Sequence, residues 1–565
     1  MRLLWRTGLF ALCAILVACS DGTDLHVDLG RSGSDLGQPT PDLGPSPDSC
    51  PTASICGGTC CGPDESCDDG VCKVVLPDCV EPAPCPLGDT CDFSTLRVVD
   101  QATADSVRQA MIDHIWKGQG FPSSRMPDSV DALSLAQSPI SGVENLAALT
   151  QFTVTMPLTP AEGGGAFTSK AIHFQPVTRV DRLFIFHQGH TGKLYAYGGD
   201  TTIRYLVKHG YDVVGLLMPL VGINTGPPGY LVHDDMEPLE SSTRCFLQFF
   251  LEPVAAVINH LQAQHTYKDV SMIGISGGGW TTTLYAAADP RVGLSFPVAG
   301  SLPLDLPDSS SLGDAEQNHP ELFVQVASYR DLYVLGGAGK GRAQVQVLNR
   351  DDSCCFSGVT YRAYENRIRA LARTLGGSFD VYLDASHGIH MISPHVLEVV
   401  VGPRIEGKKV WILEENDNGY GYPGSVYGAT YLSGIWSPLA LDVGSMGAFS
   451  STADGSGADA VWTFGHIAPG TYRVSVTWPP SPNHASDALF VVFGGANPLG
   501  SYHFVNQQVA PADLTTMGAE WADLGQSQVI TGDTLSVWLT SATSGDVVAD
   551  AVRIEQLSLG TPLCK

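Results

Sequence analysis

The sequence predicts an α/β fold with a doubly wound, mostly parallel sheet, followed by an all-β sandwich. Three observations lead to this prediction. Apolar strand-like runs alternate with helical segments over residues 93–405, as in a parallel sheet covered by helices on both faces. Short alternating runs without helical periodicity follow over residues 410–556, which is typical of a sandwich. A glycine-flanked serine in the first region stands between a strand and a helix.

Residues 1–19 have the pattern of an export signal. Two arginines precede an apolar stretch over residues 9–17, which is shorter than the roughly 20 residues that a membrane span needs. The stretch ends in Leu16-Val17-Ala18-Cys19, which resembles the bacterial lipobox. That resemblance implies cleavage before Cys19 and a lipid on its thiol. Because Ser20 follows instead of Asp, we expect an exported lipoprotein of the outer membrane or cell surface.

Two further segments separate the signal from the α/β region. Residues 20–49 are rich in Asp, Gly, Pro and Ser, so they cannot bury enough apolar surface to fold, and we expect a disordered tether. Residues 50–92 carry nine cysteines, which in an exported chain favour disulfides over zinc. Nine is an odd number, so one thiol is free to pair outside the module, with Cys245, Cys354, Cys355 or Cys564. The net charge of −27 excludes a nucleic-acid partner, which needs a basic surface.

The α/β region contains a regular series of predicted elements. Apolar runs with turn residues after them predict buried strands, and amphipathic spacing predicts helices between them. The predicted strands are 182–187, 211–218, 270–275, 322–327, 343–348 and 379–383, and the predicted helices are 104–116, 254–265 and 280–288.

The motif Gly274-Ile-Ser276-Gly-Gly278 joins a predicted strand to a predicted helix. A serine on such a turn is held in a strained conformation that lifts its Oγ above the sheet, and bulky neighbours at the two glycine positions would clash. Ser276 is therefore the predicted nucleophile. The N–H of Gly277, the next residue, is a predicted donor to the substrate oxygen.

An acid and a histidine follow Ser276 in the order that a Ser-acid-His triad requires. Asp351 and Asp352 follow one predicted strand, and His387 and His390 follow the last one. The carboxyl ends of parallel strands are the edge where such folds build their sites. We favour Asp352 as the acid and His390 as the base, with Asp351 and His387 as the alternatives.

A glycine-rich loop after the predicted strand 182–187 is the candidate for the second oxyanion donor. Its backbone N–H groups at Gly189 and His190 are expected to meet the oxyanion together with Gly277. A metal centre is the competing interpretation, since His187-x-x-His190 and His387-x-x-His390 offer four imidazoles. Because both pairs occupy positions that a hydrolase site needs, the sequence predicts no metal and no cofactor.

Two family resemblances rest on these motifs. Residues from about 115 to 403 resemble the α/β-hydrolase superfamily, in particular a branch of secreted bacterial hydrolases, through His187-Gln-Gly-His190, Gly274-Ile-Ser276-Gly-Gly-Gly279-Trp280, Asp352-Ser-Cys354-Cys355-Phe356 and His390-Met-Ile-Ser393. That resemblance implies a Ser/Asp/His triad and hydrolysis through an acyl-enzyme, and leaves the substrate open.

Residues 410–556 are similar to the golvesin C-terminal-like, or xanthan-lyase carbohydrate-binding-like, β-sandwich. A short tail follows over residues 557–565. The motifs are Trp462-Thr-Phe464, Ala468-Pro-Gly-Thr-Tyr-Arg-Val-Ser-Val-Thr-Trp478 and Val548-Ala-Asp550-Ala-Val-Arg-Ile554. The name of that family implies carbohydrate binding by analogy. We expect most of its tryptophans to belong to the core.

Together these features predict an exported, lipid-anchored serine hydrolase that acts on a carboxylic ester. The ester can belong to a small molecule or to a polymer, glycan-linked esters included. A serine peptidase on the same fold and a non-catalytic glycan-binding surface protein are the two alternatives.

Overall fold

The computed structural model describes residues 93–565 apart from 307–313, 359, 385, 414–428, 434–435, 439–450, 454–457, 466, 468, 495–499, 517–518, 533, 541–544 and 560–565. It also gives the backbone of four short strands, β1 (Ile55–Cys56), β2 (Thr59–Cys60), β3 (Glu65–Asp68) and β4 (Val71–Val74). These strands pair as two antiparallel ladders, β1 with β2 and β3 with β4. The predicted signal with Cys19, the tether and the disulfides of residues 50–92 lie outside the described residues.

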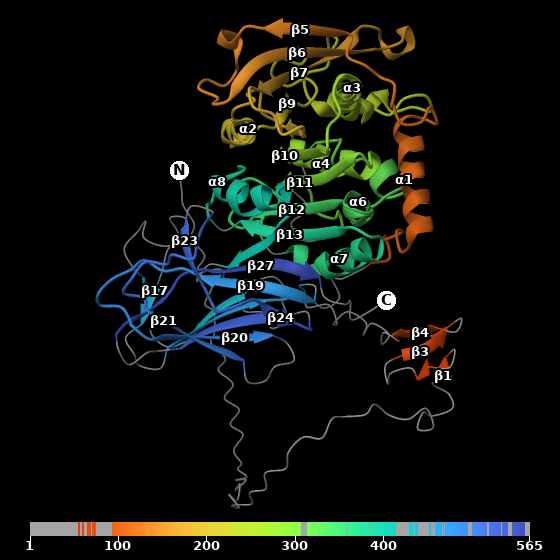
Figure 1. Cartoon of the computed structure of the whole chain (residues 1–565). Helices are drawn as coiled ribbons and strands as arrows, with labels where there is room; N and C mark the ends of the chain where they lie inside the picture. The colour runs from red at the N-terminus through yellow and green to blue at the C-terminus, as the bar shows by residue number, and fades with distance from the viewer. Residues whose placement is uncertain are drawn as a thin grey trace, which may run out of the picture. The chain divides into compact units, whose positions relative to one another are not determined.

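A nine-stranded mixed sheet dominates the α/β region (Figure 1), in the order β13-β12-β11-β10-β8-β9-β7-β6-β5. The six strands from β13 to β9 are parallel, and β7, β6 and β5 extend the sheet in antiparallel pairs. The bounds are β5 (Ser129–Leu133), β6 (Leu146–Pro157), β7 (Ala166–Pro176), β8 (Leu183–His187), β9 (Asp212–Leu216), β10 (Val270–Ile275), β11 (Val292–Val298), β12 (Ala343–Asn349) and β13 (Ser378–Asp384).

Helices cover both faces of this sheet. Along β8, Leu183 and Ile185 join one buried cluster, whereas Phe184 and Phe186 join the other, as expected for a strand buried on two sides. The first cluster contains side chains of α1 (Gln101–Ile115), α3 (Gln248–Gln264), α4 (Gly277–Ala288), α5 (Pro320–Phe323), α6 (Tyr329–Gly337) and α7 (Glu365–Thr374). The second contains side chains of α2 (Gly199–Lys208), α8 (Pro394–Val396) and α9 (Gly402–Ile405).

The predicted strands at 182–187, 211–218, 270–275, 343–348 and 379–383 are confirmed within about two residues at their ends. The strand predicted at 322–327 is wrong, because that segment begins as helix α5. Pro320 occupies the first turn of α5, and the His319 side chain accepts a hydrogen bond from the Leu322 N–H, so this capped start favours a helix. The sequence analysis missed β11 and the three antiparallel strands β5 to β7.

The C-terminal region is built of β-strands. Its larger sheets follow the orders β14-β27-β19-β23-β22, with β24 beside β19, and β15-β18-β25-β20-β21. Both sheets contribute to one core, with Trp462 and Phe490 from one and Tyr472 and Val474 from the other. Tryptophans 462, 478 and 521 are buried, as predicted, whereas Trp538 is 42% exposed. The bounds are β14 (Lys409–Leu413), β15 (Ala429–Ser433), β16 (Ser437–Pro438), β17 (Ser451–Ala453), β18 (Asp459–Phe464), β19 (Gly470–Val476), β20 (Ala488–Gly494), β21 (Ser501–Val505), β22 (Leu514–Thr516), β23 (Ala519–Asp523), β24 (Gln528–Ile530), β25 (Leu535–Thr540), β26 (Val547–Ala549) and β27 (Val552–Leu559).

None of the helices in the described part of the chain is both long enough and apolar enough to cross a membrane.

Helix α6, which packs against α4, is tied to the start of the α/β region by one buried carboxylate. The fully buried Asp331 accepts hydrogen bonds from the backbone N–H groups of Arg97, at 2.7 Å, and Val98, at 2.9 Å. Its other oxygen accepts from the N–H and the hydroxyl of Ser328, both at 2.8 Å, which closes the capping box of α6. Removal of Asp331 therefore leaves several buried donors without an acceptor.

We expect Asp331→Ala to lower the free energy of unfolding by about 2–4 kcal/mol, because each buried donor left unpaired costs about 1–3 kcal/mol. Urea denaturation followed by circular dichroism measures the change. The control is Asp113→Ala on the exposed side of α1, for which we expect a change within about 0.5 kcal/mol. Equal stability of the two variants would contradict the role given to Asp331.

Candidate active site

Ser276 lies at the turn between β10 and α4. Its φ of 58° and ψ of −129° put a non-glycine residue in the positive-φ region, which costs free energy and is held only by the surrounding structure. The Ser276 N–H donates to the Val298 carbonyl of β11 at 2.9 Å. A Cβ on Gly278 would strike the His187 carbonyl oxygen, and one on Gly274 would strike the Gly278 carbonyl oxygen. The two motif glycines are therefore required by backbones in close contact.

His390 contacts Asp352 across two loops at the carboxyl edge of the sheet. His390 Nδ1 lies 2.8 Å from Asp352 Oδ2. The same carboxylate accepts from Asn349 Nδ2 at 2.9 Å and from the Cys354 N–H at 2.8 Å. Burial would raise the pKa of Asp352, but the hydrogen bonds from His390 and from the Cys354 N–H hold it below its ordinary value. With Asp352 as the acceptor at Nδ1, the matching tautomer presents His390 Nε2 as an acceptor, and among the described residues that buried nitrogen has no hydrogen-bond partner, Ser276 Oγ included.

Asp351 and His387, the alternative acid and base, take no part in the contact between Asp352 and His390. The Asp351 side chain is 57% exposed and forms an ion pair with Arg350. His387 Nε2 lies 3.1 Å from Asp384 Oδ2, and this hydrogen bond raises the pKa of His387. Asp384 also accepts from the Ser386 N–H and from the hydroxyls of Ser386 and Ser393. His387 therefore belongs to a local network that stabilises the loop after β13.

The loop that carries Asp352 is closed by a disulfide between its two adjacent cysteines, Cys354 and Cys355. The sequence analysis named both cysteines as possible partners of a thiol of residues 50–92, and the structure pairs the two with each other. Cys245 is a buried free thiol. The N–H groups of Cys354 and Cys355 both face Asp352 Oδ1, at 2.8 and 3.3 Å. The disulfide thus constrains the backbone that supplies hydrogen bonds to the candidate acid.

The glycine-rich loop after β8 lies directly against Ser276. An added Cβ on Gly189 would come within 2.6 Å of Ser276 Cβ and 3.2 Å of the Gly277 nitrogen. The Gly189 N–H, however, donates to Gln188 Oε1 at 2.9 Å, so it is not free to bind an oxyanion. The N–H groups of His190 and Gly277 take part in none of the main-chain hydrogen bonds between described residues. Of the three predicted oxyanion donors, the N–H groups of His190 and Gly277 remain as candidates. Gly189 instead lets its loop pack closely against Ser276.

The four imidazoles considered as zinc ligands do not gather in one group within the described residues. His187 is fully buried, its Nδ1 lies 2.9 Å from the Gln188 carbonyl, and burial lowers its pKa to about 4. His387 faces Asp384 and His390 faces Asp352. The His190 side chain instead meets residues that the sequence analysis missed: His233, Asp314 and Glu316.

In the group formed by His190, His233, Asp314 and Glu316, hydrogen bonds outweigh the effect of burial on the pKa values of the two histidines. Burial would lower the pKa values of His190 and His233, but hydrogen bonds to Asp314 and Glu316 raise them to about 9 and about 10. The sequence analysis missed this group because its members come from three segments that lie far apart in the chain. The sequence analysis also missed Asn349, which ends β12 three residues before Asp352. A polar residue at the end of an apolar strand is a local signal that could have identified it.

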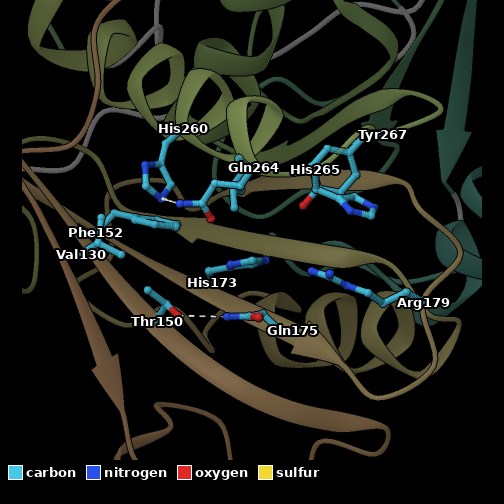
Figure 2. Close-up of a pocket in the computed structure, with 11 residues that line it drawn as sticks. Val130, Thr150, Phe152, His173, Gln175, Arg179, His260, Gln264, His265 and Tyr267 are labelled. Carbon is cyan, nitrogen blue, oxygen red and sulfur yellow. Dashed lines mark hydrogen bonds between the residues drawn. The ribbon is translucent and has the colours of Figure 1, made fainter.

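A separate pocket lies at the opposite edge of the sheet (Figure 2). It is lined by β6 and β7, the end of α3 and the segments before β8 and β10. Beneath it, the buried Asp212 accepts from Arg179 at 2.7 Å and from Tyr267 at 3.3 Å, and it lies 2.9 Å from His173 Nε2. The polar groups of this pocket satisfy one another, and Ser276 follows β10 at its other end.

Comparison with known proteins matches residues 427–556 to the Golvesin C-terminal domain. No curated protein matches the chain. Among solved structures, the acetyl xylan esterase from Paenibacillus sp. R4 has 13% identity and a TM-score of 0.35, over 56% of this chain and 99% of that one. Acetyl xylan esterase 1 from Thermoanaerobacterium sp. JW/SL YS485 has 14% identity and a TM-score of 0.37, over 56% and 96%. The Pyrococcus furiosus esterase has 12% identity and a TM-score of 0.30, over 45% and 88%.

These structural neighbours are ester hydrolases by name. At such identities and TM-scores, the function of this chain has to be inferred from the geometry around Ser276.

Substitution of each histidine separates their roles. We expect His390→Gln to lower kcat by at least about 10³-fold, as loss of a triad base does, and His387→Gln to leave kcat within about threefold, because His387 acts within its own loop. The measurement is steady-state hydrolysis of a p-nitrophenyl ester by both variants. A large loss of kcat in His387→Gln with a small loss in His390→Gln would reverse the assignment.

The stability of His387→Gln should depend on pH. The folded pKa of His387 is raised by Asp384 above the ordinary 6.5, so this contribution is complete below about pH 6.5 and is lost as the pH rises through the folded value. We expect the variant to be less stable than the wild type at pH 5.5, with a smaller difference at pH 9. Urea denaturation at the two values measures this, and a difference that grows with pH would contradict it.

Proposed function

We propose that this chain is an exported serine hydrolase of the α/β-hydrolase type that cleaves carboxylic esters with Ser276, His390 and Asp352. The observation that carries the proposal is Ser276 in a positive-φ turn at the carboxyl end of β10. The Asp352–His390 pair on the loops after β12 and β13 supports it. A strained serine between strand and helix is the geometry of a nucleophile elbow, and a carboxylate that orients an imidazole is the geometry of a general base.

The fold supports the same assignment. In the order of the sheet, β10 lies between β8 and β11, and β8 itself lies between β9 and β10, so the chain crosses over at β8. The doubly wound arrangement that we infer puts the loops after β8, β10, β12 and β13 at one edge. Along the chain, those loops carry one oxyanion donor at His190, the nucleophile with the second donor at Gly277, the acid and the base.

The reaction begins when His390 Nε2 accepts the proton of Ser276 Oγ as that oxygen attacks the carbonyl carbon of the ester. Asp352 stabilises the imidazolium that forms. Collapse of the tetrahedral intermediate breaks the bond to the alkoxy group, which leaves as an alcohol with the proton from His390. Water then attacks the acyl-enzyme, with His390 as the base again, and releases the acid while Ser276 Oγ recovers its proton.

The N–H groups of His190 and Gly277 stabilise the negative charge on the carbonyl oxygen. One such donor is worth about 10²–10³-fold in kcat in hydrolases of this mechanism. Gly277 is the first residue of α4, so its N–H has no acceptor inside the helix. The partial positive charge of that helix end adds to the stabilisation.

Ser276→Ala should abolish ester hydrolysis, because no other group on the turn replaces Oγ. The assay is p-nitrophenyl acetate and butyrate turnover, with a peptide p-nitroanilide to detect a peptidase. The matched control is Ser271→Ala in β10, the strand that leads to Ser276; the buried Ser271 Oγ has no hydrogen-bond partner among the described residues. We expect at least about a 10⁴-fold loss for Ser276→Ala and near-normal rates for the control.

An active Ser276→Ala enzyme, or an inert but folded wild type, would contradict the proposal. Turnover of the anilide in preference to both esters would support the peptidase instead. An inert wild type that binds glycans would support the non-catalytic surface protein.

An exposed aromatic face on the C-terminal domain supports a glycan-linked ester as the substrate. Trp538 lies opposite Val491, and Val491 lies opposite Tyr502, so Trp538 and Tyr502 share one face of the sheet. Phe504, two residues along β21, shares this face. The three side chains are 42%, 62% and 72% exposed. Flat exposed aromatic rings of this kind stack on sugar rings. The golvesin-type sandwich that we infer would hold the substrate polymer near the hydrolase, and a lipid on Cys19 would anchor both to the membrane.

Trp538→Ala should weaken binding to insoluble acetylated xylan at least fivefold while turnover of p-nitrophenyl acetate stays unchanged, because the small ester needs no sugar contact. A pull-down with the polysaccharide measures binding. The control is Val529→Ala, another exposed apolar residue, on β24 of the other sheet. Equal binding by wild type and Trp538→Ala would exclude this face as the glycan site.

A further inference from the structure

Four side chains beside the oxyanion loop form a compact group of metal-ligand atoms. His190 Nε2 lies 3.0 Å from Glu316 Oε1 and 3.1 Å from Asp314 Oδ2. His233 Nδ1 lies 3.1 Å from Glu316 Oε1 and 3.4 Å from Asp314 Oδ2. All four atoms lie within 4.8 Å of one another. Two imidazole nitrogens thus alternate with two carboxylate oxygens around one centre.

These separations are a few tenths of an ångström shorter than, or equal to, the ligand separations of a tetrahedral zinc site. Zinc binds imidazole nitrogen and carboxylate oxygen at about 2.0–2.2 Å, so adjacent ligand atoms of a tetrahedron lie about 3.3–3.5 Å apart. The four measured separations, from 3.0 to 3.4 Å, are four edges of such a figure. An opening of the group by a few tenths of an ångström would fit the ion. Two imidazoles and two carboxylates also form a ligand set that suits zinc.

Two contacts around the group support a ligand role. His233 Nε2 lies 2.9 Å from the Pro219 carbonyl, which would keep the Nε2 proton in place while a metal ion replaced the proton that Nδ1 now shares with Glu316. Glu316 is fully buried, and its second oxygen, Oε2, has no hydrogen-bond partner in the part of the chain that the structure describes. A buried carboxylate oxygen without a donor is costly, and a cation beside it removes that cost.

We propose that His190, His233, Asp314 and Glu316 bind one zinc ion that holds the oxyanion loop in position. The site joins three segments: the loop after β8, the start of the 3-10 helix His233–Leu239 and the segment 314–316. A hydrogen bond of 3.0 Å from the Ala315 N–H to Asp234 already connects the second and third of these. His190 supplies a ligand through its side chain and an oxyanion donor through its backbone, so the ion fixes that N–H against Gly277.

A second group in the described residues has similar ligands and a different environment. It comprises His114, Glu240, Cys245 and His319. Lys117 Nζ lies 2.5 Å from Glu240 Oε1, so a cation of the protein already pairs with the carboxylate there. This group contains a thiol, whereas the group at His190 contains none, and that difference gives the two sites distinct spectra.

The test is the metal content of protein purified without a polyhistidine tag, together with Zn²⁺ titration of the chelator-stripped chain. We expect one equivalent of zinc in the wild type. His233→Gln and Glu316→Gln should each lower the affinity at least tenfold, as removal of a ligand does. The matched control is His319→Gln in the second group, which should keep the full equivalent. Loss of zinc in His319→Gln alone, or a wild type that neither retains nor takes up zinc, would overturn the proposal.

Cobalt substitution tests the site without any variant. Co²⁺ added to the stripped wild type should give the visible absorption of a tetrahedral ion without a thiolate charge-transfer band, because nitrogen and oxygen are the only ligand atoms. A thiolate band would assign the ion to Cys245 and would overturn the proposal. This test uses only the wild type, so it is valid even if the His233→Gln and Glu316→Gln variants do not fold.

Discussion

The close approach of three backbones around Ser276 is the constraint on which the candidate site depends. The strand β10, the first turn of α4 and the loop after β8 meet where a side chain on Gly278 would strike His187 and one on Gly189 would strike Ser276. Only glycine lets the segments come this near. The positive φ of Ser276 is held by this packing and by the hydrogen bond to Val298. The same contacts that strain the serine bring the Gly277 N–H and the His190 loop to its side.

The acid and the base are organised by a second set of constraints. Asp352 is held by a side-chain amide at the end of β12 and by two N–H groups of the loop that the Cys354–Cys355 disulfide closes. Asn349 Nδ2 also lies 3.1 Å from the Met391 carbonyl, next to the base. One amide therefore joins the loop of the acid to the loop of the base. This linkage explains how two exposed connections can hold a short contact between Asp352 and His390.

Much of the site could be predicted from the sequence because its signals are local. The motif around Ser276 specifies a turn through adjacent residues. Asp352 and His390 each follow an apolar run that predicts a strand, so the sequence places both at the carboxyl ends of strands. The choices between neighbours depend on tertiary contacts, since Asp351 and Asp352 are alike in sequence and differ only in what they face. The same holds for His387, which is bound by Asp384, and for His390.

Other features depend on contacts between distant segments and left no local signal. The apolar run at 322–327 reads as a strand, but the capped start at His319 and Pro320 makes it helical. The grouping of His190 with His233 and Glu316 joins residues more than 40 positions apart, which periodicity cannot detect. The sequence gives no sign that the Gly189 N–H already has an acceptor; the structure shows that it donates to the side chain of Gln188.

The central claim is that Ser276 is the nucleophile of a working triad. Its most direct test is the site of covalent modification after treatment with diethyl p-nitrophenyl phosphate, read by intact mass and peptide mapping. We expect one diethylphosphoryl group per chain, attached to Ser276, with release of one equivalent of p-nitrophenol. A folded protein that takes up no phosphoryl group, or takes it up on another residue, would contradict the claim.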